Sequence, residues 1–455
     1  MSNRALASAV AEFFLAGEAN LEKIVARATP SFGRKWRWLR PLARRYLKAF
    51  ADKTRPRHRE VVQFLWQDRG FRRVMSLYSG ELEIEVQHAD LRRMQPAHAA
   101  QSWNVPVLES IGALADWLYL DPSELFWFAD LKALTSKKVD SRLRHYHYRV
   151  LAKAAGSIRL IEAPKPRLKE VQRRILTKIL QSIPLHPDVH GFVRGRSIKT
   201  FAAPHVGQRV VLKMDLQDFF PTFSGARIQT FFRTAGYPEA VADLLGGLCS
   251  NQVPRGLWID FGKRLAKEFG SAPTSDMNHL RLNEARTLYA RPHLPQGAPT
   301  SPALANICTY RLDCRLLGLA QSVGAQYTRY ADDLAFSGDK TFEKCVERFL
   351  TQVAAIAIEE GFRVHHRKTR IMRQGVRQYL AGVVTNRHIN AVRADFDRLK
   401  AILTNCVRQG PESQNREAHP HFRQHLLGRI SFVEMLNPAK GERLRTIFPK
   451  IHWPP

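Results

Sequence analysis

The sequence of 455 residues contains few cysteines and no long apolar run. Its five cysteines are scattered and form no Cys-x-x-Cys pair, which argues against a disulfide framework or a zinc site and predicts reduced thiols in the core. No stretch of about 18 apolar residues is present, and the N-terminus lacks the basic-then-apolar pattern of a signal peptide. We therefore expect a cytoplasmic protein without a membrane partner.

Acidic residues are scarce relative to basic ones. The chain has 41 Asp and Glu against 71 Lys and Arg, which gives a formal net charge of +30. Such an excess implies a nucleic-acid partner bound through its phosphates, with an affinity that falls steeply as salt rises. The charge says nothing about the fold. The length and the 44% of hydrophobic residues are sufficient for about two or three domains with their own cores.

Two adjacent acids stand out from this basic background. Asp332 and Asp333 lie between two short β-prone runs within residues 326–337, Gln-Tyr-Thr-Arg-Tyr-Ala-Asp-Asp-Leu-Ala-Phe-Ser. This alternation predicts a hairpin with the acids at or beside its turn. Because neighbouring strand residues point to opposite faces, two adjacent carboxylates can face one metal only at a tight turn. A third acid, Asp215, ends the apolar strand expected at 210–215, and Pro221 prevents that strand from continuing.

The order of these motifs resembles the palm of reverse transcriptases. The strand ending in Asp215 comes first, the turn-rich loop Leu-Pro-Gln-Gly-Ala-Pro at 294–299 then opens a helix, and the Tyr-Ala-Asp-Asp hairpin follows. Motif content, order and spacing all agree. The resemblance implies an α+β right-hand polymerase fold with fingers, a palm built on an antiparallel sheet, and a helical thumb. A helical N-terminal extension precedes it.

Nucleotidyl transfer explains why carboxylates are needed. The attack of a hydroxyl on an α-phosphate is assisted by two Mg²⁺ ions roughly 3.5–4 Å apart, and Mg²⁺ prefers carboxylates and phosphates as ligands. We expect Asp215 and Asp332 to bridge the metals, and Asp333 to hold the second metal or its outer shell. The family resemblance adds the backbone carbonyl of Leu216 as a contact of the metal that holds the triphosphate.

Two positions near the expected metals have roles that only the resemblance implies. Phe220 stands where these enzymes place a bulky side chain that excludes a 2′-hydroxyl; the alternative is a core aromatic next to Phe219. Lys368 stands where the family carries a palm lysine near the leaving group; a solvated charge is the alternative. Both alternatives remain open from the sequence.

The resemblance also implies nucleotide-binding residues elsewhere in the chain. Arg159 matches the fingers arginine that grips the triphosphate, for which a guanidinium is well suited, and Lys165 is a weaker candidate. Gln296 and Gly297 should line the nucleotide and template side of their loop, where glycine permits close backbone approach. A plain helix-entry turn is the alternative for that loop.

Further segments resemble retron-type reverse transcriptases in particular. Residues 190–197, His-Gly-Phe-Val-Arg-Gly-Arg-Ser, are one such segment. Residues 200–205 resemble the Asn-Ala-x-x-His insertion of these enzymes but lack its Asn. Residues 380–386 resemble their Val-Thr-Gly element, with Asn386 in place of Gly; because Asn tolerates a left-handed backbone, we expect the turn to survive. The resemblance covers about residues 108–455.

The expected division has four parts: a basic helical N-terminal extension (1–105), fingers with a retron-like insertion (106–214), a palm with a fingers insertion (215–385) and a helical thumb (386–455). Residues 34–48 combine seven basic and three aromatic side chains. They suit phosphate neutralisation with base stacking, or an amphipathic helix that packs on the fingers. The expected RNA contacts are Arg393, Arg398, Lys400, Arg423 and His205.

The resemblance implies an RNA-directed DNA polymerase of a retron. It would copy part of a structured non-coding RNA into short single-stranded DNA, with dNTPs as substrates and a guanosine 2′-hydroxyl as primer. The product is a branched RNA–DNA molecule, and the expected role is anti-phage defence with an effector protein. Only about 70 residues follow Asn386, too few for an RNase H domain, so host RNase H is expected to remove the template. The alternatives are a defence polymerase making untemplated or protein-primed DNA, and a catalytically idle RNA-binding scaffold.

Overall fold

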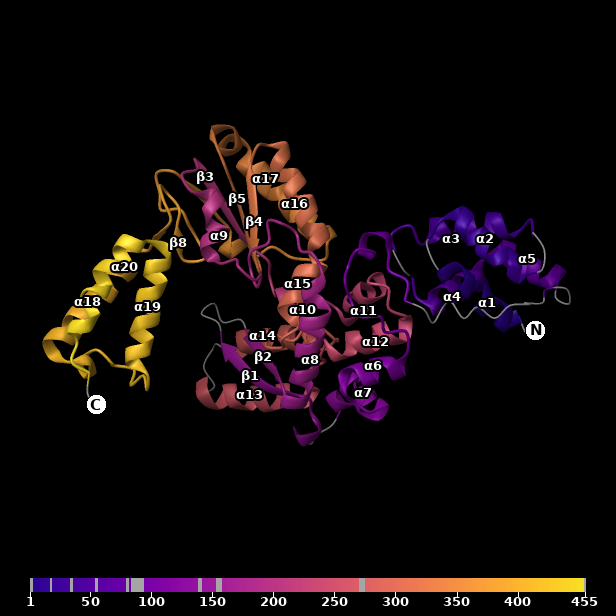
Figure 1. The fold of residues 1–455 in the computed structure, drawn as a ribbon, viewed down its shortest axis with the longest axis horizontal. Coiled ribbons are helices and arrows are strands. Elements are labelled where there is room, and N and C mark those ends of the chain that lie inside the picture. Colours follow the sequence, from indigo (N-terminus) through magenta and orange to yellow (C-terminus); the bar gives the residue numbers. More distant parts are fainter. Residues whose placement is uncertain are drawn as a thin grey trace. The chain divides into compact units, whose positions relative to one another are not determined.

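The computed structural model describes residues 3–16, 19–32, 36–53, 56–78, 82, 94–137, 141–152, 158–269 and 275–453 (Figure 1). The chain forms two compact units. The first unit comprises Met1–Pro184 and Phe220–Leu304, and the second unit comprises Leu185–Phe219 and Ala305–Pro455. Within the described residues, no helix is long and apolar enough to cross a membrane.

The first unit begins with five helices that share a hydrophobic core. These are α1 (Asn3–Leu15), α2 (Leu21–Ser31), α3 (Leu39–Ala49), α4 (His58–Gln67) and α5 (Arg69–Leu77). Capping side chains fix where two of these helices begin. The Asn20 carboxamide accepts the backbone N–H of Glu22 at 2.9 Å at the start of α2, and the Asp68 carboxylate accepts that of Phe71 at 2.7 Å at the start of α5. Phe14, Ile24 and Leu42 are among the fully buried residues.

The basic and aromatic stretch at residues 34–48 belongs to this core. Leu42 and Tyr46 of α3 are buried, and Trp38 contacts Phe71 at 6.0 Å between ring centroids. Its basic side chains lie on the outside of α3. Trp36 and Trp38 are partly buried among the N-terminal helices themselves, which corrects the expected packing on the fingers. Nucleic-acid binding by this stretch stays a prediction. Arg34 and Lys35 lie outside the described residues.

The rest of the first unit is a helical layer around a two-stranded antiparallel sheet. Strand β1 (Tyr146–Ala152) pairs with β2 (Ile158–Pro164). The helices are α6 (Ile111–Leu118), α7 (Pro122–Ala129), α8 (Pro166–Lys178), α11 (Gly225–Thr234), α12 (Glu239–Leu248), α13 (Arg255–Phe269) and α14 (Ser275–Leu288). The short helices α10 (Phe219–Thr222) and α15 (Ser301–Cys308) span the boundaries between the units. The N-terminal helices join this layer through backbone and side-chain bonds, such as His58 N–H to Glu239 at 2.9 Å.

The second unit contains a four-stranded antiparallel sheet in the order β4-β5-β3-β6. The strands are β3 (Val210–Asp215), β4 (Gln326–Tyr330), β5 (Asp333–Gly338) and β6 (Arg370–Arg373). Five of the six residues of β3 are buried, as expected for a central strand. Helices α16 (Tyr310–Ser322) and α17 (Lys340–Glu359) pack beside the sheet (Figure 1). The short helix α9 (Ile198–Ala202) contacts β4.

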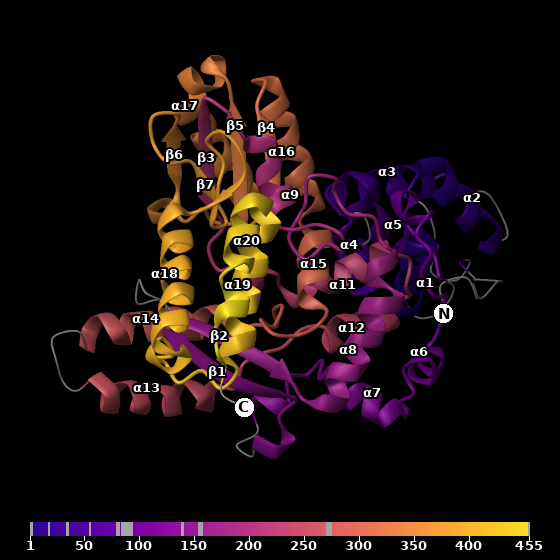
Figure 2. The same ribbon diagram turned by 60° about the vertical axis from the view of Figure 1, so that its left-hand side comes forward.

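The C-terminal part of the second unit combines a small sheet with three helices. Strands β7 (Tyr379–Leu380), β8 (Val383–Val384) and β9 (Asn390–Ala391) form the sheet. Helices α18 (Arg393–Gln409), α19 (Phe422–Leu436) and α20 (Pro438–Arg445) follow and can be traced in Figure 2. The expected α+β class and antiparallel sheets are confirmed.

Two expectations need correction here. Asn386 is absent from the left-handed residues of the described chain; its side chain instead accepts from the Gln378 N–H at 2.9 Å and donates to the Val376 carbonyl at 2.8 Å. The left-handed residues of this region are Ala381 and Gly382, in the β7–β8 turn. Of the five free cysteines, Cys249 and Cys406 are buried, but Cys314 is exposed and is not a core residue.

Candidate active site

Strand pairing brings three aspartates to one end of the four-stranded sheet. Asp215 is the last residue of β3 and lies directly opposite Asp333, the first residue of β5. Asp332 occupies the turn between β4 and β5, where Tyr330 pairs with Asp333. The backbone N–H of Leu216 donates to the Asp332 carbonyl at 2.8 Å. The predicted hairpin is therefore present with its acids at the turn.

Two lysines lie beside these carboxylates. Lys368 Nζ contacts both carboxylate oxygens of Asp215, at 3.1 and 3.0 Å. Lys213, on β3, lies 3.0 Å from a carboxylate oxygen of Asp333. Lys368 is thus an ion-pair partner of Asp215 rather than a solvated charge, although half of its side chain remains exposed.

The environment makes the carboxyl groups of Asp332 and Asp333 harder to ionise. Burial raises the pKa of Asp332, and the nearby charges of Asp215 and Asp333 raise it further. Burial also raises the pKa of Asp333, although the Lys213 ammonium opposes that effect. The cluster is therefore an electrostatically unfavourable group of acids that bound cations would stabilise.

The donor set fits Mg²⁺ in its chemistry. Carboxylate and carbonyl oxygens are the ligands that this hard cation prefers, together with water and phosphate. Among the described residues, however, no three acidic, His or Cys side chains are grouped as a preformed metal site.

The turn that carries Asp332 is strained and closely packed. Ala331 has φ = 55°, in the left-handed region that L-residues avoid. The α-carbon of Gly191 lies against this turn: a Cβ at Gly191 would be 2.4 Å from the Ala331 nitrogen. The chain before Gly191 follows β4, since the His190 N–H donates to the Arg329 carbonyl at 2.7 Å. From the sequence, residues 190–197 were noted only for their resemblance to retron-type enzymes, and their contact with the Asp332 turn was not predicted.

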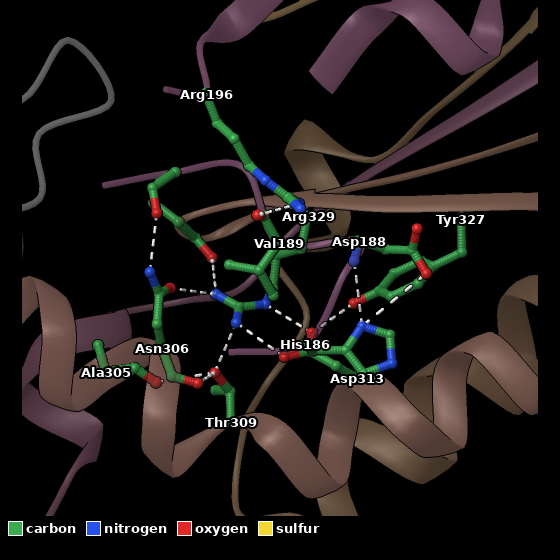
Figure 3. A network of polar contacts seen from close by, with 12 residues as sticks. His186, Asp188, Val189, Arg196, Ala305, Asn306, Thr309, Asp313, Tyr327 and Arg329 are labelled. Carbon is green, nitrogen blue, oxygen red and sulfur yellow. Dashed lines mark hydrogen bonds and ion pairs between the residues drawn. The ribbon is translucent and has the colours of Figure 1, made fainter. Parts of the chain in front are cut away.

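A buried arginine braces the same turn (Figure 3). Arg329 is fully buried, and all five of its N–H groups have acceptors nearby. Two bonds go to the carboxylate of Asp313, at 2.7 and 2.8 Å. The other acceptors are the Thr309 hydroxyl at 2.7 Å, the Asn306 amide oxygen at 3.0 Å and the Ala331 carbonyl at 3.1 Å.

Asn306 extends this network to the neighbouring loop. Its amide nitrogen donates to the Gly191 carbonyl at 2.8 Å, so that one carboxamide joins Arg329 to the segment that abuts Ala331. The Tyr327 hydroxyl donates to Asp313 at 2.7 Å. Arg329 and Asp313 were not among the predicted site residues. The available signal was a basic residue inside the predicted strand, three positions before Asp332.

Phe219 and Phe220 differ in their surroundings. Phe219 is buried, stacks on Phe362 at 6.0 Å between ring centroids, and lies under the Arg329 guanidinium at 5.9 Å. Phe220 is only partly buried. The proposed exclusion of a 2′-hydroxyl by Phe220 therefore stays a prediction.

The predicted nucleotide-binding residues of the first unit lie along β2 and the loop beside it. Arg159 is exposed on β2, and Lys165 Nζ donates to the Arg142 carbonyl at 2.9 Å. The Gln296 carbonyl accepts the Glu162 N–H at 2.9 Å. Gly297 has φ = 134°, and a Cβ there would lie 2.9 Å from the Glu162 carbonyl oxygen. The observed close approach is thus to β2, and nucleotide binding stays a prediction.

A buried polar cluster beneath β2 was not predicted. Glu162 contacts His293 Nε2 at 3.0 Å and accepts from the Asn251 amide at 2.7 Å. Burial lowers the pKa of His293, but the facing carboxylate outweighs this effect and the pKa is raised. These three residues are far apart in the chain, and no local pattern indicates their pairing.

The structure contradicts the expected RNA contact of His205. This side chain is fully buried, and its ring nitrogens pair with the hydroxyls of Ser337 at 2.7 Å and Thr328 at 2.8 Å. Burial lowers its pKa to about 3, so the ring is neutral at pH 7. His205 therefore links β4 and β5 from within. The other four expected RNA contacts, Arg393, Arg398, Lys400 and Arg423, are exposed on α18 and α19.

An acidic hairpin on an antiparallel sheet, with a third aspartate opposite it, is the arrangement of a metal-dependent nucleotidyl transferase. The family model described as reverse transcriptase (RNA-dependent DNA polymerase) matches residues 151–384, just over half of the chain. The chain therefore belongs to the reverse transcriptase family.

Relatives among known proteins confirm the resemblance to the retron type. The chain is 42% identical to the Retron Mx65 reverse transcriptase of Myxococcus xanthus, over 67% of this chain and 64% of that protein. It is 37% identical to the Retron Mx162 reverse transcriptase of the same organism, over 73% of this chain and 65% of that protein. The chain is 28% identical to the Retron Ec86 reverse transcriptase of Escherichia coli, over 65% of this chain and 77% of that protein. The matches thus span slightly less than two thirds of the length of the two Myxococcus proteins.

Proposed function

We propose that this protein is the RNA-directed DNA polymerase of a retron. The observation that carries the proposal is the placement of Asp332 in the turn between β4 and β5, with Asp215 and Asp333 paired beside it. Its family membership and its similarity to retron reverse transcriptases support the proposal. The product would be short single-stranded DNA, copied from part of a structured non-coding RNA and branched from a guanosine 2′-hydroxyl.

In this proposal the parts of the fold have distinct tasks. The four-stranded sheet with α16 and α17 is the palm, and α18, α19 and α20 form the thumb. The helical layer around β1 and β2 forms the fingers, and α1 to α5 are the N-terminal extension. The exposed basic residues of α18 and α19, Arg393 among them, contact the RNA. An effector protein and host RNase H complete the proposed defence system.

The chemistry follows from the aspartate cluster. Asp215, Asp332, Asp333 and the Leu216 carbonyl would hold two Mg²⁺ ions, which neutralise charge on the attacking and leaving oxygens when bound. The Leu216 N–H fixes the backbone of Asp332 through its 2.8 Å bond. Lys368 Nζ, now 3.0 Å from Asp215, supplies a positive charge for the departing pyrophosphate. Arg159 and Lys165 would bind the triphosphate, and Phe220 would exclude ribonucleotides.

The test is the isosteric change Asp332→Asn, assayed by extension of a DNA primer on an RNA template with Mg²⁺. We expect RNA binding to persist and synthesis to fall by several orders of magnitude, because a metal loses its charged ligand. The matched control is Asp260→Asn, which makes the same change on the exposed surface of α13. Near wild-type synthesis by Asp332→Asn would show that the aspartate cluster is not the catalytic centre.

A second measurement separates the remaining alternatives. The DNA made by the wild-type protein is sequenced from reactions with two unrelated templates. Products complementary to each template support RNA-directed synthesis. Products independent of the template would support the alternative of an untemplated or protein-primed polymerase, and absence of any product would support an idle scaffold.

A further inference from the structure

An exposed tyrosine ends helix α6 in a strained conformation. Tyr119 has φ = 56° and ψ = 48°, the left-handed region in which helices usually end on glycine. Its N–H donates to the Asp116 carbonyl at 3.1 Å, and the next N–H, of Leu120, donates to the Ala115 carbonyl at 3.0 Å. The side chain contributes little to the core, since Tyr119 is 70% exposed. A bulky residue at this position costs backbone strain, and folding alone does not explain it.

Helix α8 holds this tyrosine from one side. The guanidinium carbon of Arg174 lies 4.3 Å from the centroid of the Tyr119 ring and 5.1 Å from that of Trp117. Arg167, about two turns earlier on the same face of α8, donates to the Tyr119 carbonyl at 2.8 Å. The Nε of Arg174 is buried and has no hydrogen-bond partner among the described residues. Arg174 thus stacks on both aromatic rings of the end of α6.

The surface around the ring is strongly basic. Helix α8 contains five basic residues and one acidic residue. Arg167, Lys169, Arg173 and Lys178 are all exposed. Glu170, the acidic residue, lies 3.3 Å from Arg167 in an exposed pair of small energetic value. Arg167 and Lys178 lie on the same face of α8 as Arg174, next to the ring, whereas Lys169 and Arg173 lie on another exposed part of the helix.

We propose that Tyr119 is a stacking platform for an unpaired base of single-stranded nucleic acid, whose phosphates contact the basic face of α8. An exposed aromatic ring beside a positive track is the arrangement that binds single strands without reading their sequence. The Arg174 guanidinium keeps the ring oriented. Charge complementarity favours a polyanion over an apolar protein partner. This site lies on α6 and α8 and does not depend on the aspartate cluster, so it adds to the proposed function.

The direct test is photocrosslinking with a 12-nucleotide oligouridine that carries 5-iodouridine, followed by mass spectrometry of the peptides. We expect the crosslink at Tyr119, because iodouracil reacts with the aromatic ring on which it stacks. The same experiment with an oligodeoxyuridine separates an RNA strand from a DNA strand as the natural occupant. The proposal is wrong if crosslinks form elsewhere in the protein but not on the 111–119 peptide with either oligomer.

The matching variants separate binding from folding. Tyr119→Gly removes the ring and relieves the left-handed strain, so we expect an unchanged or higher Tm together with about tenfold weaker binding of labelled oligouridine at moderate salt. Tyr119→Phe should retain the affinity, and Ile259→Ala, at an exposed residue of α13, should have no effect. Equal affinities of wild type and Tyr119→Gly would overturn the proposal and favour a protein partner for this surface. Primer extension in the same preparations reports on the proposed polymerase separately.

Discussion

Substitutions of the buried pair Arg329–Asp313 can distinguish an effect on stability from an effect on catalysis. Replacing Arg329 by Met removes every hydrogen bond of the guanidinium and leaves the Asp313 carboxylate fully buried, with the Tyr327 hydroxyl as a remaining donor. Breaking a buried pair on one side costs about 3–5 kcal/mol. That is a large part of a typical total of about 5–15 kcal/mol, so we expect a folded but clearly less stable variant.

The double replacement Arg329→Met with Asp313→Leu should recover part of the stability, because no unpaired charge stays buried, although the Tyr327 hydroxyl then lacks its acceptor. Two apolar side chains of suitable volume can replace a buried ion pair at little or no cost. The Ala331 carbonyl and the Asn306 amide oxygen, however, still lack the donor that Arg329 provides at 3.1 and 3.0 Å. A lost bond to a charged donor is worth about 1.5–3 kcal/mol, so the turn that carries Asp332 loses its brace. We expect DNA synthesis at least about tenfold below wild type in the double variant.

The assay combines urea unfolding with primer extension over a range of Mg²⁺ concentrations. Loss of positioning should raise the Mg²⁺ requirement and lower kcat, which a purely structural role would not do in a variant that remains folded at the assay temperature. The control is Arg209→Met, which breaks the exposed pair of Arg209 with Glu343 and should cost less than about 1 kcal/mol. If the double variant remains folded and retains wild-type synthesis, Arg329 does not position the turn.

Three further predictions concern other parts of the chain. Phe220→Ala should admit ribonucleotides into the product; unchanged selectivity for deoxynucleotides would return Phe220 to a packing role. Deleting residues 1–105 should weaken RNA binding and its salt dependence but preserve preference for the cognate RNA, whereas exchanging residues 386–455 for those of another retron enzyme should switch that preference; the opposite pattern would place recognition at the N-terminus. His205 has a folded pKa of about 3, below the unfolded value of about 6.5, so its contribution to stability is full above pH 6.5 and is lost as the pH falls toward 3. His205→Gln should therefore reduce acid destabilisation by about 1.4 kcal/mol per pH unit between pH 6 and 4, as measured by urea unfolding; an unchanged slope would contradict the burial argument.

Local sequence was sufficient for the elements that carry the aspartates. Alternation of apolar and polar residues around Asp332 predicted the hairpin, and the apolar run before Asp215 predicted the strand. The pairing of Asp215 with Asp333 was not contained in either segment, because register between distant strands depends on the whole sheet. Only the resemblance to reverse transcriptases had placed the three acids in one site.

Errors arose where a polar or aromatic side chain has distant partners. His205 was expected at an RNA surface, but Ser337 and Thr328 on two strands satisfy its ring nitrogens inside the protein. Packing on the fingers was one expectation for Trp38, but Phe71 lies beside it within the N-terminal core. The residue type shows which hydrogen bonds or ring contacts such a side chain can make. It does not give the burial of the side chain, which is decided by elements far away in the chain.

The turn with Asp332 illustrates why several distant residues are needed at one site. Ala331 adopts a left-handed backbone that costs an alanine roughly 1 kcal/mol, so the turn does not hold its shape through local preference. Three contacts hold it instead: the Leu216 N–H on Asp332, the Arg329 guanidinium on the Ala331 carbonyl, and the close approach of Gly191. Because they come from three separate segments, a change in any of them should move the same carboxylate. The precision that metal-dependent chemistry requires is therefore a property of the packed second unit as a whole.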